Sequence, residues 1–372
     1  MNHINTSRLS FLVAGIVLSL LFGYIAQKYR DLSNTTDRER ATRLHKKGVF
    51  FIILSCLAMW LPSALRYNVG IDNDTYQMQF NAMSQLSDAF LYYEPGYGLL
   101  CYLCKSWFND YQVLIFITAM ITGGLMWRSI YKYSNSIVLC IVGCIAVNMY
   151  FMSFTVIRQF ISIAILLNSV EFIKDRKPIQ FVVLLILAAS FHYTALIFGV
   201  LYLLYSDNLQ LFTKKNILIV ASVFLFFSYI DSILGSAFTT LSALREGYSD
   251  YEYSDASKNI AEIIFLLPVL LYALVYRKQL IDLNRMNSVL FWVVVMLFVS
   301  KAIGMVSPGL SRVHYYFVFC TPFMMSYSTK LKSNLSRLIL PFVIIIYYVW
   351  SIQNIFEYQW EDFLPYQSIL QK

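Results

Sequence analysis

The sequence predicts an all-α, polytopic integral membrane protein that crosses or enters the bilayer about eleven times. Of its 372 residues, 58% are hydrophobic and only 13% are charged, whereas a soluble domain carries roughly a quarter charged residues. Apolar runs of roughly twenty residues, the length that crosses a bilayer, recur along the chain. These runs are continuous rather than alternating, which favours helices over the strands of a membrane barrel.

The basic residues set the expected orientation of the chain. They cluster in short segments between the apolar runs, which is the pattern of cytoplasmic loops, so the net charge of +8 does not indicate a nucleic-acid partner. The segment 28–47 carries seven Lys and Arg residues and is expected to be a cytoplasmic loop. The amino terminus is then outside. Residues 66–97 and 233–258 are expected to be external loops of a single transmembrane domain, 1–372.

The same alternation places each membrane segment in turn. Between 136 and 170 the only formally charged side chain is Arg158, and this stretch is too long for one span but suits two. Arg158 then falls near the external turn between them. Residues 179–205 are long for one helix, and we expect two short helices that meet near Phe191 and His192. The expected segments are 9–26, 48–65, a re-entrant or very short helix at 95–108, then 111–127, 137–153, 156–173, 179–205, 260–276, 289–306, 313–328 and 338–353.

Charged residues and histidines outside the basic loops fall at the external helix ends. Taken singly, each has a simple explanation: a terminal arginine that reaches the interface, a solvated loop acid, a helix-start carboxylate or a structural histidine. However, an ionised side chain at membrane depth costs roughly 2.5–3.5 kcal/mol and tends to face a functional cavity. We therefore expect a shared external cavity built from Arg66, Asp72, Asp74, Glu94, Arg158, His192, Arg312 and His314, with Lys301 about two turns deeper.

These residue types predict the chemistry of the cavity. Arginine suits phosphate because its planar fork donates two parallel hydrogen bonds, and carboxylates and imidazoles are the usual acid–base groups. No spacing matches a metal motif, no glycine-rich nucleotide loop occurs, and Cys101 and Cys104 have the apolar flanks of packed cysteines. We expect no cofactor, and metal-free handling of an anionic, phosphorylated, lipid-borne substrate outside the cytoplasm.

Four ordered strings give the sequence a family resemblance. LRYNVGIDNDTYQMQF, YEPGYGLLCYL, FTVIRQFISIAILL and KDRKPIQFVVLLILAASFHYTALIF resemble the EpsG family, bacterial polysaccharide polymerases related to the Wzy O-antigen polymerases. The resemblance covers roughly residues 48–330, and Ser311-Arg312 is its main match in the last third of the chain. The set of strings is specific, although each string alone is weak.

The resemblance implies a metal-independent glycosyltransferase that joins undecaprenyl-diphosphate-linked oligosaccharide units at the outer face of the bacterial inner membrane. The product would be O-antigen, capsule or exopolysaccharide. A flippase and a chain-length regulator of the same pathway would be its protein partners, beside membrane lipids. In this interpretation Arg66, Arg158 and Arg312 hold the diphosphate. One of three groups takes the proton of the acceptor hydroxyl, namely His192, Asp72 or Glu94, and the other candidates are Asp74, His314 and Lys301.

Two other functions fit the same residues. A flippase or transporter of lipid-linked glycans could line its pathway with these arginines, although transporters often have internal repeats and none is visible here. A glycan ligase would need similar chemistry. The aromatic stretch 248–255 could stack on sugar rings or could be a solvated loop.

Overall fold

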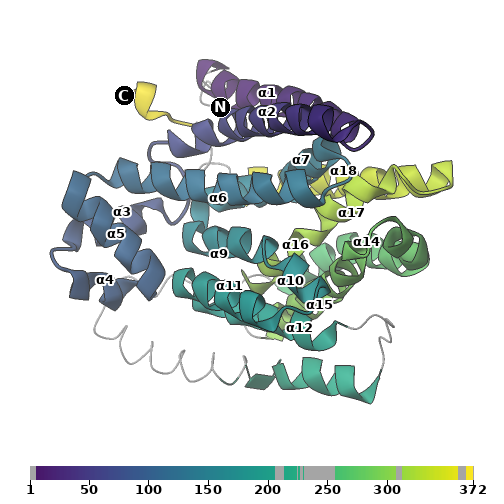
Figure 1. Ribbon diagram of the computed structural model, residues 1–372. Helices are drawn as coiled ribbons and strands as arrows, with labels where there is room; N and C mark the ends of the chain where they lie inside the picture. The colour runs from purple at the N-terminus through teal and green to yellow at the C-terminus, as the bar shows by residue number, and fades with distance from the viewer. Residues whose placement is uncertain are drawn as a thin grey trace.

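The computed structural model describes residues 6–205, 213–223, 225–226, 229, 256–306, 312–358 and 366–371, and within them the regular structure is helical (Figure 1). An isolated antiparallel bridge joins Arg66 to Ser368. The all-α prediction is confirmed. The helices are α1 Thr6–Ser33, α2 Arg38–Ala64, α3 Asn73–Ala82, α4 Leu86–Tyr92, α5 Pro95–Phe108, α6 Tyr111–Tyr133, α7 Ile137–Ala146, α8 Met149–Thr155, α9 Ile157–Leu167, α10 Val170–Lys174, α11 Pro178–Phe191, η1 Tyr193–Gly199, α12 Val200–Leu204, α14 Ala256–Leu283, α15 Met286–Val306, α16 Tyr315–Val318, α17 Cys320–Ser328, α18 Asn334–Tyr358 and η3 Ile369–Gln371.

The described part of the chain contains four helices that are long and apolar enough to cross a membrane, namely α1, α2, α6 and α15. The pair α7 and α8 would add a fifth span that is bent by 53°. Shorter apolar helices occupy 157–167, 178–191, 193–204 and 334–346. The polytopic prediction is confirmed, and many of the expected membrane segments are short or broken helices.

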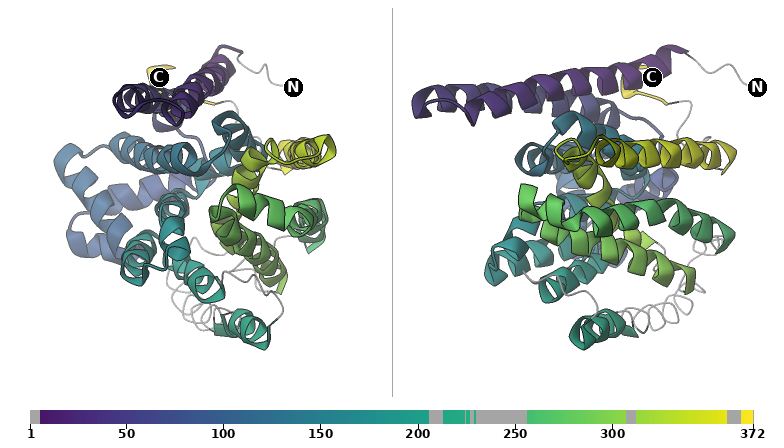
Figure 2. Two further views of the ribbon diagram at one scale, coloured as in Figure 1. Left: turned by 45° about the vertical axis from the view of Figure 1, so that its right-hand side comes forward. Right: turned by 90° about the vertical axis from the view of Figure 1, so that its right-hand side faces the viewer.

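The long helices lie side by side across the molecule. α1 packs along α2, α2 packs against α6, and α14 packs against α15 (Figures 1 and 2). Three buried rings fill the core beneath the first pair, because Trp60 meets both Trp127 and Tyr150 edge-to-face at 5.9 and 5.6 Å between ring centroids. Gly123 makes room for them, since a Cβ there would lie 2.4 Å from the Trp60 ring.

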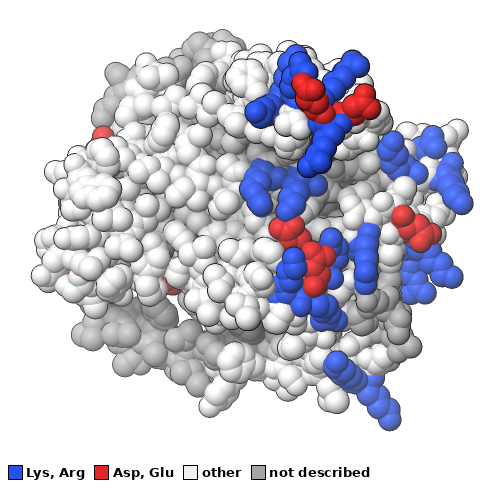
Figure 3. Space-filling view, in the orientation of Figure 1, with Lys and Arg blue, Asp and Glu red and all other residues white. Residues whose placement is uncertain are grey.

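On the face seen in Figure 3, most charged side chains gather at one end of the bundle. Lys and Arg side chains gather over one half of the face seen in Figure 3, at the end where the turn between α1 and α2 lies. Helices α3, α4 and α5 lie at the opposite end (Figure 1). The separation follows the pattern of basic and polar segments in the sequence.

Three expected segment boundaries can be compared with the structure. The predicted break within 179–205 is confirmed: α11 ends at Phe191, His192 is extended with φ −159° and ψ 113°, and η1 begins at Tyr193. The segment 28–47 is not a long loop, because helix continues to Ser33 and resumes at Arg38. Residues 66–97 contain α3, α4 and the start of α5.

The second expected external loop, 233–258, is described only at its end. Residues 256–258 form the first turn of α14. Residues 233–255, with the aromatic stretch 248–255, lie outside the described residues.

Candidate functional site

The site is built around Glu94, the residue that precedes α5. Its backbone is extended, and Pro95 follows at the first helical position, where a missing N–H costs nothing. The Glu94 carbonyl accepts the first helical hydrogen bond, from the N–H of Gly98 at 2.8 Å. Its carboxylate makes no capping hydrogen bond to the helix. The side chain therefore extends away from α5 and reaches α9 and the break after α11.

Each carboxylate oxygen of Glu94 has a cationic or imidazole partner. Oε2 lies 2.6 Å from Nη1 of Arg158, and Oε1 lies 2.8 Å from Nδ1 of His192. The backbone N–H of Tyr193 also donates to Oε1, at 3.4 Å. Three separate helix ends thus meet at one carboxylate, and we name Glu94, Arg158 and His192 the Glu94 cluster.

The charge state of Glu94 follows from these partners. Burial by itself would raise the pKa of the carboxyl, but the hydrogen bond from His192 and the positive charge of Arg158 outweigh it and lower the pKa to about 2. The group is therefore ionised at neutral pH and can only accept hydrogen bonds. Because Nδ1 of His192 faces this acceptor, Nδ1 carries the proton, and Nε2 of a neutral ring keeps the lone pair.

Arg158 is enclosed by aromatic rings as well as by Glu94. Its guanidinium lies over the rings of Tyr93 and Tyr76, at 5.3 and 5.8 Å from their centroids, and Nε donates to the Tyr76 hydroxyl at 3.4 Å. Arg158 stands in the first turn of α9, where the helix dipole disfavours a cation. Glu94 and the ring faces offset that cost. This explains how one arginine is accommodated in an otherwise uncharged stretch.

A second ion pair lies at the start of α3. Nη1 of Arg312 is 3.3 Å from Oδ2 of Asp72, the residue that precedes α3. The Arg312 carbonyl accepts from Nε2 of Gln159, the neighbour of Arg158 in α9, at 2.8 Å. Tyr76 stands one turn after Asp72, with its N–H bonded to the Asp72 carbonyl at 3.1 Å. α3 and α9 therefore connect this pair to the Glu94 cluster.

Arg66 has a different environment from the other two arginines. It is only 3% exposed and donates to the carbonyls of Ser63 and Phe154, at 2.7 and 3.3 Å. Its guanidinium also lies 5.1 Å from the centroid of the Phe154 ring. Arg66 thus ties the end of α2 to α8 within the protein interior, instead of lining a cavity with Arg158 and Arg312 as the sequence led us to expect.

The remaining predicted residues lie around the cluster or deeper. Asp74 stands in the first turn of α3 and accepts from the Asn73 side chain at 3.3 Å. His314 precedes α16, and its ring centroid is 4.1 Å from that of Tyr315. Lys301 is buried in α15, at 6% exposure.

The profile of the EpsG family matches residues 49–368 of the chain. The chain belongs to the EpsG family. The matched region contains the Glu94 cluster, Asp72 and Arg312. The family comprises membrane proteins of the Wzy-like polysaccharide polymerase type. No curated protein and no solved structure matches the chain significantly.

Sequence reasoning missed the aromatic residues beside the Glu94 cluster. The rings of Tyr76 and Tyr93 stack on each other, and the Arg158 guanidinium lies beside both of them, yet neither tyrosine was selected as a candidate. The signals were weak but present: Tyr93 directly precedes Glu94, and Tyr76 stands four residues after Asp72, which is one helical turn. Tyr193 contributes only its backbone N–H, which residue type does not reveal.

No group of three or more His, Cys, Asp or Glu side chains that could hold a metal ion occurs in the described ranges. The Glu94 cluster and the neighbouring ion pair offer a substrate two arginines, two carboxylates and one imidazole, namely Arg158, Arg312, Asp72, Glu94 and His192. Together they can bind an anion, orient an imidazole and accept a proton from a hydroxyl group.

Proposed function

We propose that this EpsG-family protein is a polysaccharide polymerase that works at the outer face of the bacterial inner membrane. It transfers a growing glycan from undecaprenyl diphosphate to a fresh lipid-linked repeat unit, and it uses no metal. One observation carries the proposal: the Glu94 carboxylate joins Arg158 at 2.6 Å and His192 at 2.8 Å. An anion-binding group is thereby placed beside an oriented imidazole, as transfer from a diphosphate requires.

In the proposed reaction, His192 is the base. The acceptor hydroxyl oxygen forms a bond to the anomeric carbon of the donor sugar, and the bond from that carbon to the diphosphate oxygen breaks. The bonding electrons leave with the diphosphate, and the hydroxyl proton passes to Nε2 of His192. Glu94 holds the ring through Nδ1 and stabilises the imidazolium that forms.

Arg312 is the proposed diphosphate ligand, assisted by Arg158. Its side chain is 40% exposed, and its bond to Asp72 is long at 3.3 Å. A diphosphate can replace Asp72 on one edge of the guanidinium and gain two parallel hydrogen bonds. Arg158 is held by Glu94 and two rings, so it supplies positive charge close to the leaving group. Arg66 takes a structural role in this proposal, because both of its Nη atoms donate to backbone carbonyls.

The reaction type is tested by the surface glycan of a strain without this protein. Polymerase loss should leave single repeat units attached at the surface and remove the ladder of longer products from a gel. The wild-type gene should restore the ladder, and His192→Ala should not. Complete loss of surface glycan, single units included, would assign the protein to the flippase or ligase class instead.

The orientation is tested by cysteine labelling. The six native cysteines are all buried, so the unmodified chain provides the background. Thr35→Cys, in the turn between α1 and α2, should be shielded from an impermeant thiol reagent in intact spheroplasts, whereas Ser87→Cys in α4 should react. The reverse pattern would place the Glu94 cluster on the cytoplasmic side and contradict the proposal.

A further inference from the structure

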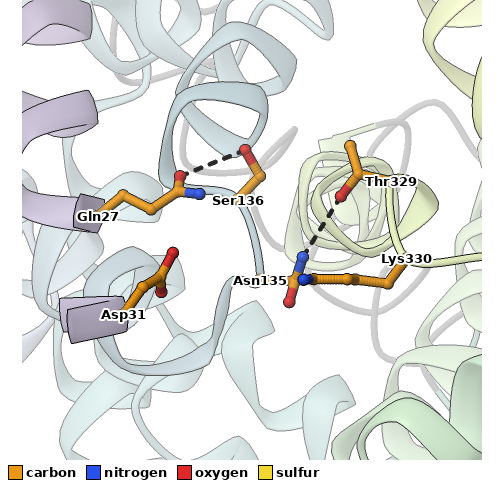
Figure 4. Close-up of a pocket in the computed structure, with 6 residues that line it drawn as sticks. All are labelled: Gln27, Asp31, Asn135, Ser136, Thr329 and Lys330. Atoms are coloured by element: carbon orange, nitrogen blue, oxygen red, sulfur yellow. Dashed lines mark hydrogen bonds between the residues drawn. The ribbon is translucent and has the colours of Figure 1, made fainter. Parts of the chain in front are cut away.

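A polar hollow lies at the basic end of the bundle, near the end of α1. Figure 4 shows the residues that line it. Its volume is about 310 Å³, and helix ends far apart in the sequence contribute its walls. Gln27 and Asp31 of α1 stand on one side, Lys330 and Thr329 follow α17 on the other, and the turn between α6 and α7 lies between them. The residues that line it are Gln27, Asp31, Asn135, Ser136, Thr329 and Lys330.

The floor of this hollow is rigid. Arg30 donates to the carbonyls of Tyr131, Ser134 and Asn135 at 2.7, 2.9 and 2.7 Å, and so fixes the turn between α6 and α7 against α1. The side-chain Oε1 of Gln27 accepts from the backbone N–H of Ile137 at 2.9 Å. A site held by such short bonds keeps its shape without a ligand.

The polar groups of the rim are bonded much more weakly. Ser136 reaches Gln27 at 3.4 Å, and the Asn135 amide reaches Thr329 at 3.4 Å (Figure 4). Bonds of this length are near the limit for hydrogen bonding. A ligand that offers better geometry can therefore replace them at little cost.

The two charged side chains of the rim approach from opposite walls. Asp31 enters from α1 and Lys330 from the end of α17 (Figure 4). Both lie in the described part of the chain, and no ion pair joins them there. Asp31 is 58% exposed, and its ion contact is to Nε of Arg30, at 3.7 Å. A cation and an anion that face one hollow without meeting suit a ligand with both signs of charge.

We propose that this hollow binds a phosphoethanolamine group, with its phosphate on Lys330 and Asn135 and its primary ammonium on Asp31. A phosphate accepts from the lysine and the amide, and an ammonium donates to the carboxylate. The ligand's source is the headgroup of an ethanolamine phospholipid in the adjacent leaflet, because the hollow lies at the basic end of membrane-length helices, where headgroups are found. This proposal does not depend on the proposed enzymatic function.

Native mass spectrometry of the purified, delipidated full chain tests the phosphate contact. Phosphatidylethanolamine, phosphatidylglycerol and phosphatidylcholine of identical acyl chains are titrated separately. The wild-type chain should retain one molecule of phosphatidylethanolamine in preference to the other two. Lys330→Ala should weaken its retention about tenfold, the effect of losing one charge-assisted hydrogen bond. Lys332→Ala, a nearby exposed lysine outside the hollow, is the matched control and should leave retention unchanged.

The ammonium contact is tested by a change of preference instead of a loss of binding. Asp31→Asn removes the anion, so the variant should bind phosphatidylglycerol at least as well as phosphatidylethanolamine. Asp37→Asn, in the exposed turn between α1 and α2, should keep the wild-type preference. A folding defect cannot change the preference from one lipid to another. Asp31→Asn therefore still tests the proposal if Lys330→Ala is unstable.

Three outcomes of the lipid titrations would overturn the proposal. They are equal retention of the three lipids by the wild-type chain, unchanged retention in Lys330→Ala, and an unchanged preference in Asp31→Asn. In a final competition experiment, soluble phosphoethanolamine is added to the lipid-bound protein. It should displace the lipid only in large excess, and displacement at equal concentration would assign the hollow to a soluble ligand and contradict the lipid source.

Discussion

Glu94 and His192 are 98 residues apart in the sequence, yet Oε1 of the carboxylate and Nδ1 of the ring lie 2.8 Å apart. The contact depends on two local features of the chain. Pro95 starts α5 directly after Glu94, and α11 breaks at His192 before η1 begins. The two side chains therefore project from helix ends that meet, and the other oxygen of Glu94 adds Arg158.

Replacement of Glu94 by glutamine should disable glycan transfer with little change in side-chain volume. The amide cannot stabilise an imidazolium, and its NH₂ group can hold His192 in the wrong tautomer. We expect the transfer rate to fall about 100-fold or more, the usual contribution of general acid–base catalysis. The measurement is the length of the glycan ladder at matched expression. Glu171→Gln is the control, because Glu171 pairs with Lys132, away from the cluster. A normal ladder from the Glu94 variant would exclude the proposed role of Glu94 in orienting His192.

Lysine should not replace Arg158. A lysine ammonium could pair with Glu94, but it lacks the planar guanidinium that lies against the rings of Tyr93 and Tyr76 and has no second edge for phosphate. We expect polymerisation to fall about tenfold or more, from the loss of charge-assisted hydrogen bonds. Arg176→Lys provides the control, since Arg176 also lies over two tyrosine rings but near the basic end. Equal ladders from wild type and Arg158→Lys would show that a point charge is enough.

The pH dependence of stability should report the ionisation of Glu94. Its pKa in the folded protein is about 2, below the ordinary value of 4.5, so the group stabilises the fold above pH 4.5 and that contribution is lost as pH falls toward 2. The shift corresponds to roughly 3 kcal/mol. The stability gap between wild type and Glu94→Gln, measured by thermal unfolding of the purified protein, should therefore not shrink from pH 8 to about pH 5. The gap should narrow at lower pH, and a gap that closes between pH 7 and 5 would be incompatible with a low pKa.

Gly96→Ala should move α5 away from α11 and separate Glu94 from His192. A Cβ at Gly96 would lie 2.4 Å from Oγ of Ser190 and 2.9 Å from its carbonyl oxygen. Overpacking of this kind costs about 1–3 kcal/mol, and the ladder should shorten as well. Gly124→Ala is the matched control, because a Cβ there meets nothing within 4 Å. If the Gly96 variant is as stable and as active as the Gly124 variant, the close approach of α5 to α11 is not required.

The sequence was sufficient for the fold class and for several local features. Apolar length and basic clusters predicted the helical membrane fold, and the length of 179–205 together with the charge topology predicted its break near Phe191 and His192. Helix bounds around 28–47 were missed, because helix formation extends beyond apolar runs into charged residues that hydropathy excludes.

Part of the site could also be anticipated. Charge and topology selected Glu94, Arg158 and His192 as candidates that share one face, and the structure brings them together. The same rule selected Arg66, which instead binds the carbonyls of Ser63 and Phe154 in the interior. A pattern of charges at helix ends cannot distinguish an arginine that faces a cavity from one that caps backbone carbonyls. That distinction depends on the packing of α2 against α8.

The most direct test of the central claim is the rate of glycan transfer by the purified protein in liposomes, with a synthetic polyprenyl-diphosphate oligosaccharide as donor and acceptor. His192→Ala, Asp72→Asn and the double variant His192→Ala with Glu94→Gln are compared with wild type. We predict that His192→Ala lowers the transfer rate about 100-fold or more. The double variant should be no slower than the His192 variant, because His192 and Glu94 act as a unit. Asp72→Asn should retain most of the wild-type rate. Normal transfer by His192→Ala together with an inactive Asp72→Asn would contradict the account and assign the base to Asp72.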